Sequence, residues 1–202
     1  MGQDLWKFEK KALGKGFLRI AVIDEAGRGP LAGPVISAAV ILHESFPASQ
    51  ICDSKMLTPK KRDYFYEMIY EHSVSIGIGI VDSFEIDRIN ILNASLLSMA
   101  ISVQNLFPFP DYLLIDGIFN IPFDLPQETI IKGDSLSISV GCASIVAKVT
   151  RDRLMDRYHN YFPEYGFNCH KGYPTKKHKE AISEYGLCFF HRKTFKGVKE
   201  CL

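Results

Sequence analysis

The sequence lacks the paired cysteines, long apolar runs and one-signed charge that mark several protein classes. Its five cysteines are an odd number without C-x-x-C spacing, so neither a disulfide framework nor a zinc site is indicated. The longest apolar stretch, Val35–Leu42, is far shorter than the roughly 20 residues that span a bilayer. The N-terminus has no apolar segment of the signal-peptide type. We therefore expect a cytoplasmic protein with reduced thiols and no membrane partner.

The formal net charge of +1 argues against a uniformly basic nucleic-acid binder, but the charge is unevenly distributed. Residues 1–147 hold 12 Lys and Arg against 17 Asp and Glu, whereas residues 148–202 hold 12 against 6. Such asymmetry indicates a polyanionic partner for the basic part. A solvated basic helix face explains the same charges equally well at this stage.

Apolar runs and turn signals alternate along the chain and predict a mixed α/β sheet. Strands are expected at residues 17–23, 35–42, 74–81, 112–115 and 129–131. Helices are expected at residues 58–72, 83–106, 140–161 and 175–185. The first two strands should form an antiparallel pair, and Thr58-Pro59 should cap the first of these helices.

Acidic residues follow three of the predicted strands. Asp24 and Glu25 follow the first, Asp116 the fourth and Asp134 the fifth. One acid after a strand is ordinarily a turn residue. Three such ends in one sheet could gather four carboxylates, whose mutual repulsion a cation must offset. Mg²⁺ or Mn²⁺ suits such oxygen ligands, and two ions can activate a water against a phosphodiester. Such a metal site requires that these strand ends be adjacent in the sheet.

Seven ordered motifs resemble those of type 2 ribonuclease H, the ribonuclease HII family. They are D-E-A-G-R-G-P with L-A-G-P-V at 24–35, D-S-K at 53–55, L-I-D-G at 114–117, K-G-D at 132–134, A-S-I-V-A-K-V-T-R-D at 143–152, H-K-G-Y-x-T-x-x-H at 170–178 and H-R at 191–192. Together they cover roughly residues 17–195 in the order of the family. A single D-E-x-G would be weak, but the ordered set is specific.

The resemblance implies an α/β fold of the RNase H-like type, with a mixed five-stranded sheet flanked by helices and a small helical C-terminal extension. Residues 1–165 would form the catalytic domain. Residues 166–202 would form a basic extension that carries the substrate-contacting tyrosine and packs on the same core.

The resemblance also assigns site residues. The catalytic acids, which would also bind two Mn²⁺ or Mg²⁺ ions, fall on Asp24, Glu25, Asp116 and Asp134. The substrate-contacting positions fall on Gly27, Arg28, Gly29, Lys55 and Tyr173. Glycine lets the backbone approach a ribose 2′-OH, and Arg28 offers a fork of donors to the scissile phosphate. Tyr173 would stack near the ribose at the junction, although without the resemblance it reads as a packing aromatic.

Other charged residues near these motifs have less defined roles. Asp152 is expected to pair with a neighbouring Arg rather than bind metal. Lys148 and Arg151 would either contact phosphates or offset the acid cluster. Three histidines lack metal-ligand spacing and would be structural or phosphate-facing, namely His170, His178 and His191. Met56 and Leu136 stand where the family commonly has basic residues, which removes cationic contacts to nucleic acid.

The implied function is an endoribonuclease that hydrolyses the RNA strand of RNA/DNA hybrids and nicks 5′ of ribonucleotides embedded in duplex DNA. A two-metal-ion mechanism would leave 3′-OH and 5′-phosphate ends. The expected partners are RNA/DNA hybrids and DNA duplexes containing ribonucleotides, bound by a monomer. The alternative is a non-catalytic hybrid-binding module with the same fold. The presence of all four acids favours the enzyme.

Overall fold

A computed structural model describes residues 4–47, 57–133 and 136–201 of the chain. Its centre is a five-stranded sheet in the order β3-β2-β1-β4-β5. The strands are β1 (Ile20–Ala26), β2 (Val35–Leu42), β3 (Ser73–Val81), β4 (Tyr112–Asp116) and β5 (Gln127–Ile130). β1 pairs antiparallel with β2, and β2 with β3, whereas β4 runs parallel to both β1 and β5. The predicted mixed sheet, with its antiparallel first pair, is confirmed.

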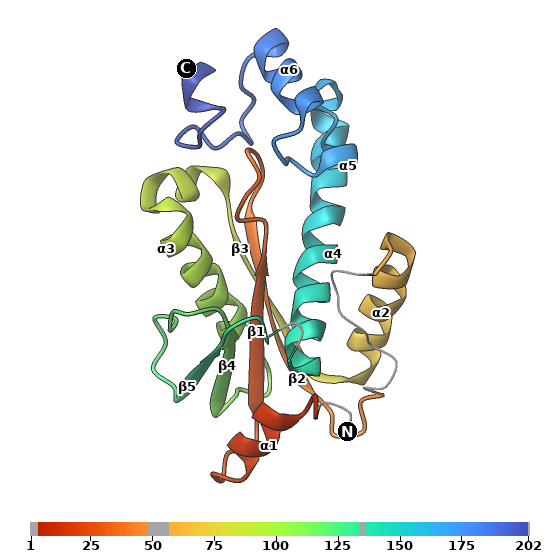
Figure 1. Ribbon diagram of the computed structural model, residues 1–202, viewed down its shortest axis with the longest axis vertical. Coiled ribbons are helices and arrows are strands. Elements are labelled where there is room, and N and C mark those ends of the chain that lie inside the picture. The colour runs from red at the N-terminus through yellow and green to blue at the C-terminus, as the bar shows by residue number, and fades with distance from the viewer. Residues whose placement is uncertain (1–3, 48–56, 134–135, 202) are drawn as a thin grey trace.

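Helices cover both faces of this sheet (Figure 1). The long ones are α2 (Pro59–His72), α3 (Ser83–Gln104) and α4 (Ile138–Tyr161). Because β2 is sandwiched between two helices, its side chains are buried on both faces. Ala38 and Val40 belong to the apolar cluster on the α2 and α4 side, whereas Ala39 and Ile41 pack with residues of α3. This burial explains the uninterrupted apolar run of β2 in the sequence.

The shorter elements lie at the two ends of the molecule (Figure 1). They are α1 (Lys7–Leu13), η4 (Pro163–Tyr165), α5 (Phe167–His170), α6 (Lys176–Tyr185) and η5 (Lys199–Cys201). The C-terminal elements sit over the turn between β1 and β2, at the end opposite α1. In that contact, Leu31 and Ala32 of the turn share an apolar cluster with Phe167, Ile182 and Val198.

Several element boundaries differ from the sequence expectation. β1 begins at Ile20 and continues through Asp24 and Glu25 to Ala26, because its ladder with β2 extends to the Ala26–Ile36 pair. Both acids therefore belong to the strand rather than to the turn that follows it. α4 begins two residues before the expected position, with Ser137 as its cap. The cap of α2 is the predicted one, since Thr58 Oγ1 accepts from the backbone N–H of Lys61.

By length and composition, α3 could cross a membrane, although such a helix is equally typical of a protein core. Here its buried residues, including Met99 and Val103, pack against the sheet. The helix is interrupted at Asn90, where φ is 67° and ψ is 165°. The side-chain oxygen of Asn90 accepts hydrogen bonds from the N–H groups of Leu92 and Asn93, so that it caps a new helical start inside α3.

Two glycines of β3 allow α3 to approach the sheet closely. A Cβ atom added to Gly79 would lie 1.8 Å from the carbonyl oxygen of Ser98. One added to Gly77 would lie 2.0 Å from the carbonyl oxygen of Ser102. Both distances are far inside van der Waals contact, and the clashing atoms belong to helix backbone. α3 can rest against β3 only because these positions have no side chain.

We predict that Gly79→Ala lowers the free energy of unfolding by about 3 kcal/mol, because the added methyl group forces α3 away from the sheet. Val74→Ala is the matched control, since Val74 is on the same strand but 43 % exposed. Urea unfolding of both variants measures the difference. Equal stability of the two variants would show that this contact does not constrain the packing of α3.

Candidate active site

The parallel pairing of β1 with β4 brings the predicted acids of these strands together. In this register Ile23 lies opposite Ile115, so Asp24 and Asp116 are the next residues on neighbouring strands. Glu25 follows at the C-terminal end of β1. The sequence could only suggest that the strand ends meet, and the strand order shows that β1 and β4 do.

Asp24 is the most buried of the clustered carboxylates, with 6 % of its surface exposed. Burial raises its pKa well above the usual value, and the nearby charges of Glu25 and Asp116 raise it further. Its Oδ1 accepts a hydrogen bond of 2.7 Å from the N–H of Glu25, and a second bond with the Ser144 side chain also favours the charged form. Burial likewise raises the pKa of Glu25, opposed by Arg28, whose Nη1 lies 3.2 Å from its Oε1.

Asp116 ties the end of β4 to the segment after β5. Its Oδ1 accepts a hydrogen bond of 2.7 Å from the N–H of Gly133. The fourth predicted acid, Asp134, directly follows Gly133 in the sequence. Asp134 itself lies outside the described residues, as does the predicted substrate contact Lys55.

The chemistry of the clustered groups fits a hard divalent cation. All three described ligand candidates are carboxylates, and the nearby charge of Asp116 disfavours the charged forms of Asp24 and Glu25. A bound cation would reverse that penalty. Within residues 4–47, 57–133 and 136–201, no group of three or more His, Cys, Asp or Glu side chains is already arranged to hold a metal ion. The site therefore has the right donors without a preformed cage among the described residues.

A cavity of about 350 Å³ joins three predicted site residues from distant parts of the chain, namely Glu25, Gly27 and Tyr173. Gly29 also lies close to Tyr173, since a Cβ added there would be 3.8 Å from the Cε1 atom of that ring. Tyr173 is 41 % exposed and thus accessible to a ligand. The turn after β1 and the loop before α6 therefore line one cavity together with Glu25.

The same cavity is lined by residues that the sequence did not single out, Arg62 and Ser144. Ser144 stands one helical turn before Lys148 on α4, so both face the cavity. This spacing is a signal that could have found Ser144. No such signal marks Arg62, because an arginine near the start of a helix is ordinarily a solvent-exposed residue.

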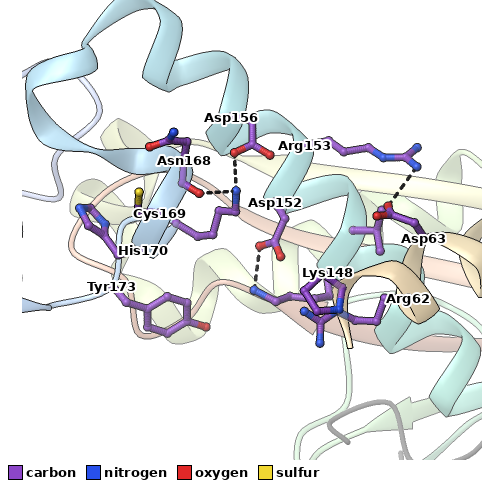
Figure 2. A pocket seen from close by; sticks show the side chains of 13 residues that line it. Arg62, Asp63, Lys148, Asp152, Arg153, Asp156, Asn168, Cys169, His170 and Tyr173 are labelled. Carbon is purple, nitrogen blue, oxygen red and sulfur yellow. Dashed lines mark hydrogen bonds and ion pairs between the residues drawn. The ribbon is translucent and has the colours of Figure 1, made fainter. Parts of the chain in front are cut away.

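A second hollow of about 780 Å³ continues from this cavity and shares Arg62, Lys148 and Tyr173 with it (Figure 2). The Nζ atom of Lys148 lies 5.7 Å from the centre of the Tyr173 ring and 2.7 Å from Asp152 Oδ1. Asp152 thus pairs with Lys148, whereas the sequence favoured a neighbouring Arg. The reason is the spacing of four residues on α4, which places the two side chains on one face.

Two further cations of this hollow, Lys171 and Arg153, are also paired with acids (Figure 2). Lys171 contacts Asp156 and the carbonyl oxygen of Asn168. Arg153 lies 3.3 Å from Asp63 and forms a further pair with α2. The hollow therefore presents several cations whose side chains are already oriented by ion pairs.

The histidines form a structural network rather than a ligand set. His178 and His191 approach each other through their Nε2 atoms at 3.2 Å, and burial lowers the pKa of each to about 4. His178 Nδ1 donates to the carbonyl oxygen of Tyr173 at 3.0 Å, and His170 stacks on His178 at 4.4 Å. The network braces the backbone of Tyr173, which decides between the two roles left open by the sequence.

Comparison with known proteins identifies the family. Residues 21–198 match the family model for ribonuclease HII. The chain belongs to the ribonuclease HII family. A ribonuclease HII of Geobacter metallireducens is 54 % identical over 198 residues, which are 98 % of this chain and 93 % of that protein. As a member of this family, the chain is a hydrolytic endoribonuclease that acts on RNA/DNA hybrids and depends on divalent metal ions. The non-catalytic alternative is not favoured.

Solved structures share the fold of this ribonuclease HII chain. Ribonuclease H2 of Pyrococcus horikoshii superposes with a TM-score of 0.77 at 24 % identity, over 91 % of this chain and 97 % of the other. Bst-RNase HIII in complex with Mn²⁺ gives a TM-score of 0.73 at 19 % identity, over 91 % and 69 % of the two chains. At these identities the likeness establishes the mixed sheet with flanking helices.

The raised pKa of Asp24 predicts how the metal-free ribonuclease HII responds to pH. The folded state holds the Asp24 proton to higher pH than the unfolded state does, whose pKa is about 3.9. The free energy of unfolding therefore falls as pH rises from the unfolded pKa through the folded pKa. Asp24→Asn avoids this loss, and its amide oxygen can still accept from the N–H of Glu25.

We accordingly expect metal-free Asp24→Asn to be more stable than wild type at pH 7, by about 1 kcal/mol, with the advantage fading below pH of about 4. Thermal unfolding in a chelating buffer across this pH range measures the difference. Asp124→Asn, at an exposed acid, is the control and should change little. A destabilised Asp24→Asn at pH 7 would contradict the repulsion inferred for the carboxylates.

Proposed function

We propose that this ribonuclease HII cuts on the 5′ side of ribonucleotides, both in RNA/DNA hybrids and singly embedded in duplex DNA. The proposed ligands of two Mg²⁺ or Mn²⁺ ions are Asp24, Glu25, Asp116 and Asp134. The observation that carries the proposal is the meeting of the β1 and β4 carboxylates beside a cavity that also contains Gly27 and Tyr173. The proposed metal ligands thus lie beside a surface that could contact a ribose.

The ions, when bound, would lower the pKa of a coordinated water and stabilise charge on the leaving oxygen. The carboxylates would hold them, and the hydrogen bond with Ser144 would keep Asp24 oriented. Cleavage on the 5′ side of the ribonucleotide breaks the bond between phosphorus and the 3′ oxygen of the preceding nucleotide. The products are a 3′-OH end and a 5′-phosphate end, with the ribonucleotide on the latter.

The turn after β1 is the proposed reader of the ribose. Within the described residues, the backbone N–H groups of Gly27, Arg28 and Gly29 donate no hydrogen bond to a protein group. They are therefore available to a 2′-OH, the group that distinguishes RNA from DNA. Tyr173 faces this turn and would pack against the neighbouring sugar. Arg28 can leave its exposed pair with Glu25 to bind the scissile phosphate.

The hollow beside the cavity is the proposed path of the nucleic-acid backbone. Its cations, among them Lys148 and Lys171, would exchange carboxylate partners for phosphates.

We further propose that the enzyme works as a monomer in the cytoplasm, without a membrane partner, and removes ribonucleotides from DNA during repair. Free thiols at all four described cysteines are in keeping with a reducing compartment.

The direct test of this function uses a duplex with one ribonucleotide, incubated with Mg²⁺ or Mn²⁺. We expect wild type to nick the duplex on the 5′ side of the ribonucleotide. Asp116→Asn should lower kcat by at least about 10³-fold, because a ligand carboxylate is lost while the bond from Gly133 can persist. Absence of a metal-dependent nick, or full activity of Asp116→Asn, would refute the proposal.

Salt dependence tests the role of the basic C-terminal part. In a triple variant, Lys171, Lys176 and Lys177 are all replaced with Gln. If these lysines contact phosphates, the association constant of this variant should fall less steeply with salt, and the slope of its logarithm against log salt should be shallower by about 0.9 per lost contact. Lys7→Gln is the control, because Lys7 is an exposed residue of α1 at the opposite end of the molecule. Binding titrations at several salt concentrations give the slopes. Equal slopes for wild type and the triple variant would remove these lysines from the binding surface.

A further inference from the structure

Two arginines lie in the interior, and neither forms an ion pair with a carboxylate in the part of the chain that the structure describes. The side chains of Arg151 and Arg192 are both 0 % exposed. Buried charges in proteins are normally paired with opposite charges. Across the described residues, however, every hydrogen bond donated by these two guanidinium groups ends on a backbone carbonyl oxygen. Two charged side chains are thus used to hold backbone.

Arg192 forms hydrogen bonds with both the beginning and the end of the turn that follows β1. Its Nη2 donates to the carbonyl oxygen of Gly27 at 2.6 Å, and its Nη1 donates to that of Arg28 at 3.0 Å. Its Nε donates to the carbonyl oxygen of Gly33 at 2.9 Å, where the turn returns toward β2. The flat guanidinium fork fixes these carbonyls relative to one another, which a single ammonium group cannot do.

Arg192 is itself firmly placed. Its backbone N–H donates to the carbonyl oxygen of Leu31 at 2.8 Å, and its guanidinium lies 4.9 Å from the centre of the Phe195 ring. The carboxylate of Asp87 accepts from the next two backbone N–H groups, those of Lys193 and Thr194, at 2.7 and 2.9 Å. The C-terminal segment therefore acts as a rigid support for the turn.

Because the peptide unit is planar, fixing the direction of a carbonyl group also fixes the direction of the N–H group of the next residue. In a planar trans peptide, the C=O of one residue and the N–H of the next point in opposite directions. When Arg192 draws the Gly27 and Arg28 carbonyls inward, the N–H groups of Arg28 and Gly29 must point away from it. These are two of the N–H groups that donate to no protein group within the described ranges.

We propose that Arg192 is a positioning residue for ribonucleotide recognition, because its guanidinium fork orients the Arg28 and Gly29 N–H groups toward the ribose 2′-OH. The proposal rests on the function proposed above for the turn. Arg192 does not contact substrate, since it is fully buried beneath the turn. Its loss should therefore reduce the preference for ribonucleotide over deoxyribonucleotide rather than general affinity for nucleic acid.

Arg151 provides a matched control within the same interior. Its donors end on the carbonyl oxygens of Pro34 at 3.0 Å, Ala32 at 3.1 Å and Lys171 at 3.0 Å. None of these carbonyls belongs to the peptides that carry the Arg28 and Gly29 N–H groups. Arg151→Lys thus disturbs an equally buried guanidinium in the same packing environment, but leaves those two N–H groups held by Arg192.

The experiment compares wild type, Arg192→Lys and Arg151→Lys in the full chain. The dissociation constant is measured in a chelating buffer for a duplex with one ribonucleotide and for the same duplex made only of DNA. Partial unfolding weakens both affinities equally and cancels in their ratio. The preference for ribonucleotide is the dissociation constant for the DNA-only duplex divided by that for the duplex with one ribonucleotide. We expect Arg192→Lys to lower this ratio at least about 10-fold toward one, and to lower kcat/KM with Mg²⁺ by about 10²-fold. Arg151→Lys should keep the wild-type ratio.

Two results would overturn the positioning role, an unchanged ratio in Arg192→Lys or an equal loss of the ratio in Arg151→Lys. Should Arg192→Lys not fold, Arg192→Gln is the second variant, since a neutral amide leaves no buried charge unpaired. It should lose the preference in the same way. A wild type that binds both duplexes equally would instead refute ribose reading by this turn, so the two failures are distinguishable.

Discussion

Parallel pairing between β1 and β4 places like charges side by side, and much of the structure follows from that constraint. Asp24 and Asp116 occupy neighbouring strand ends, and burial leaves Asp24 little water to screen it. Such an arrangement is unfavourable in the protein alone, as the raised pKa of Asp24 expresses. Divalent cations bound there, as proposed above, would make it favourable. The repulsion between these carboxylates would then contribute to the affinity of the site for metal.

The same strand leads from buried negative charge to buried positive charge. Within a few residues of Asp24, the chain enters the turn whose carbonyls surround Arg192 and Arg151. Cations would neutralise the carboxylates from outside, whereas backbone dipoles stabilise the guanidinium groups from inside. The close fit leaves Gly27 without room for a side chain, since an added Cβ would lie 2.1 Å from Arg151 Nε. A glycine is required there for packing as well as for its φ of 96°.

The sequence was informative where a signal is local. The apolar run of β2, the Thr58 cap and the acids near the C-terminal ends of β1 and β4 could be predicted because each depends on neighbouring residues. The continuation of β1 through Glu25 could not, since pairing with β2 rather than propensity decides it. The buried state of Arg192 was equally hidden, because an arginine beside histidine and lysine resembles a surface residue. Only the tertiary contacts of the turn reveal what it holds.

The charge asymmetry of the chain acquires a specific meaning from the ion pairs. Some lysines of the basic C-terminal part are already paired with acids, since Lys148 contacts Asp152 and Lys171 contacts Asp156. Both pairs are partly exposed, so a phosphate that approaches from solvent could replace the carboxylate as the partner of the lysine. Until then the pairs restrain long side chains that would otherwise lose entropy on binding. If the hollow binds the nucleic-acid backbone as proposed, the acids among the lysines would preorganise its cations rather than cancel them. A chain of net charge +1 could bind a polyanion in this way.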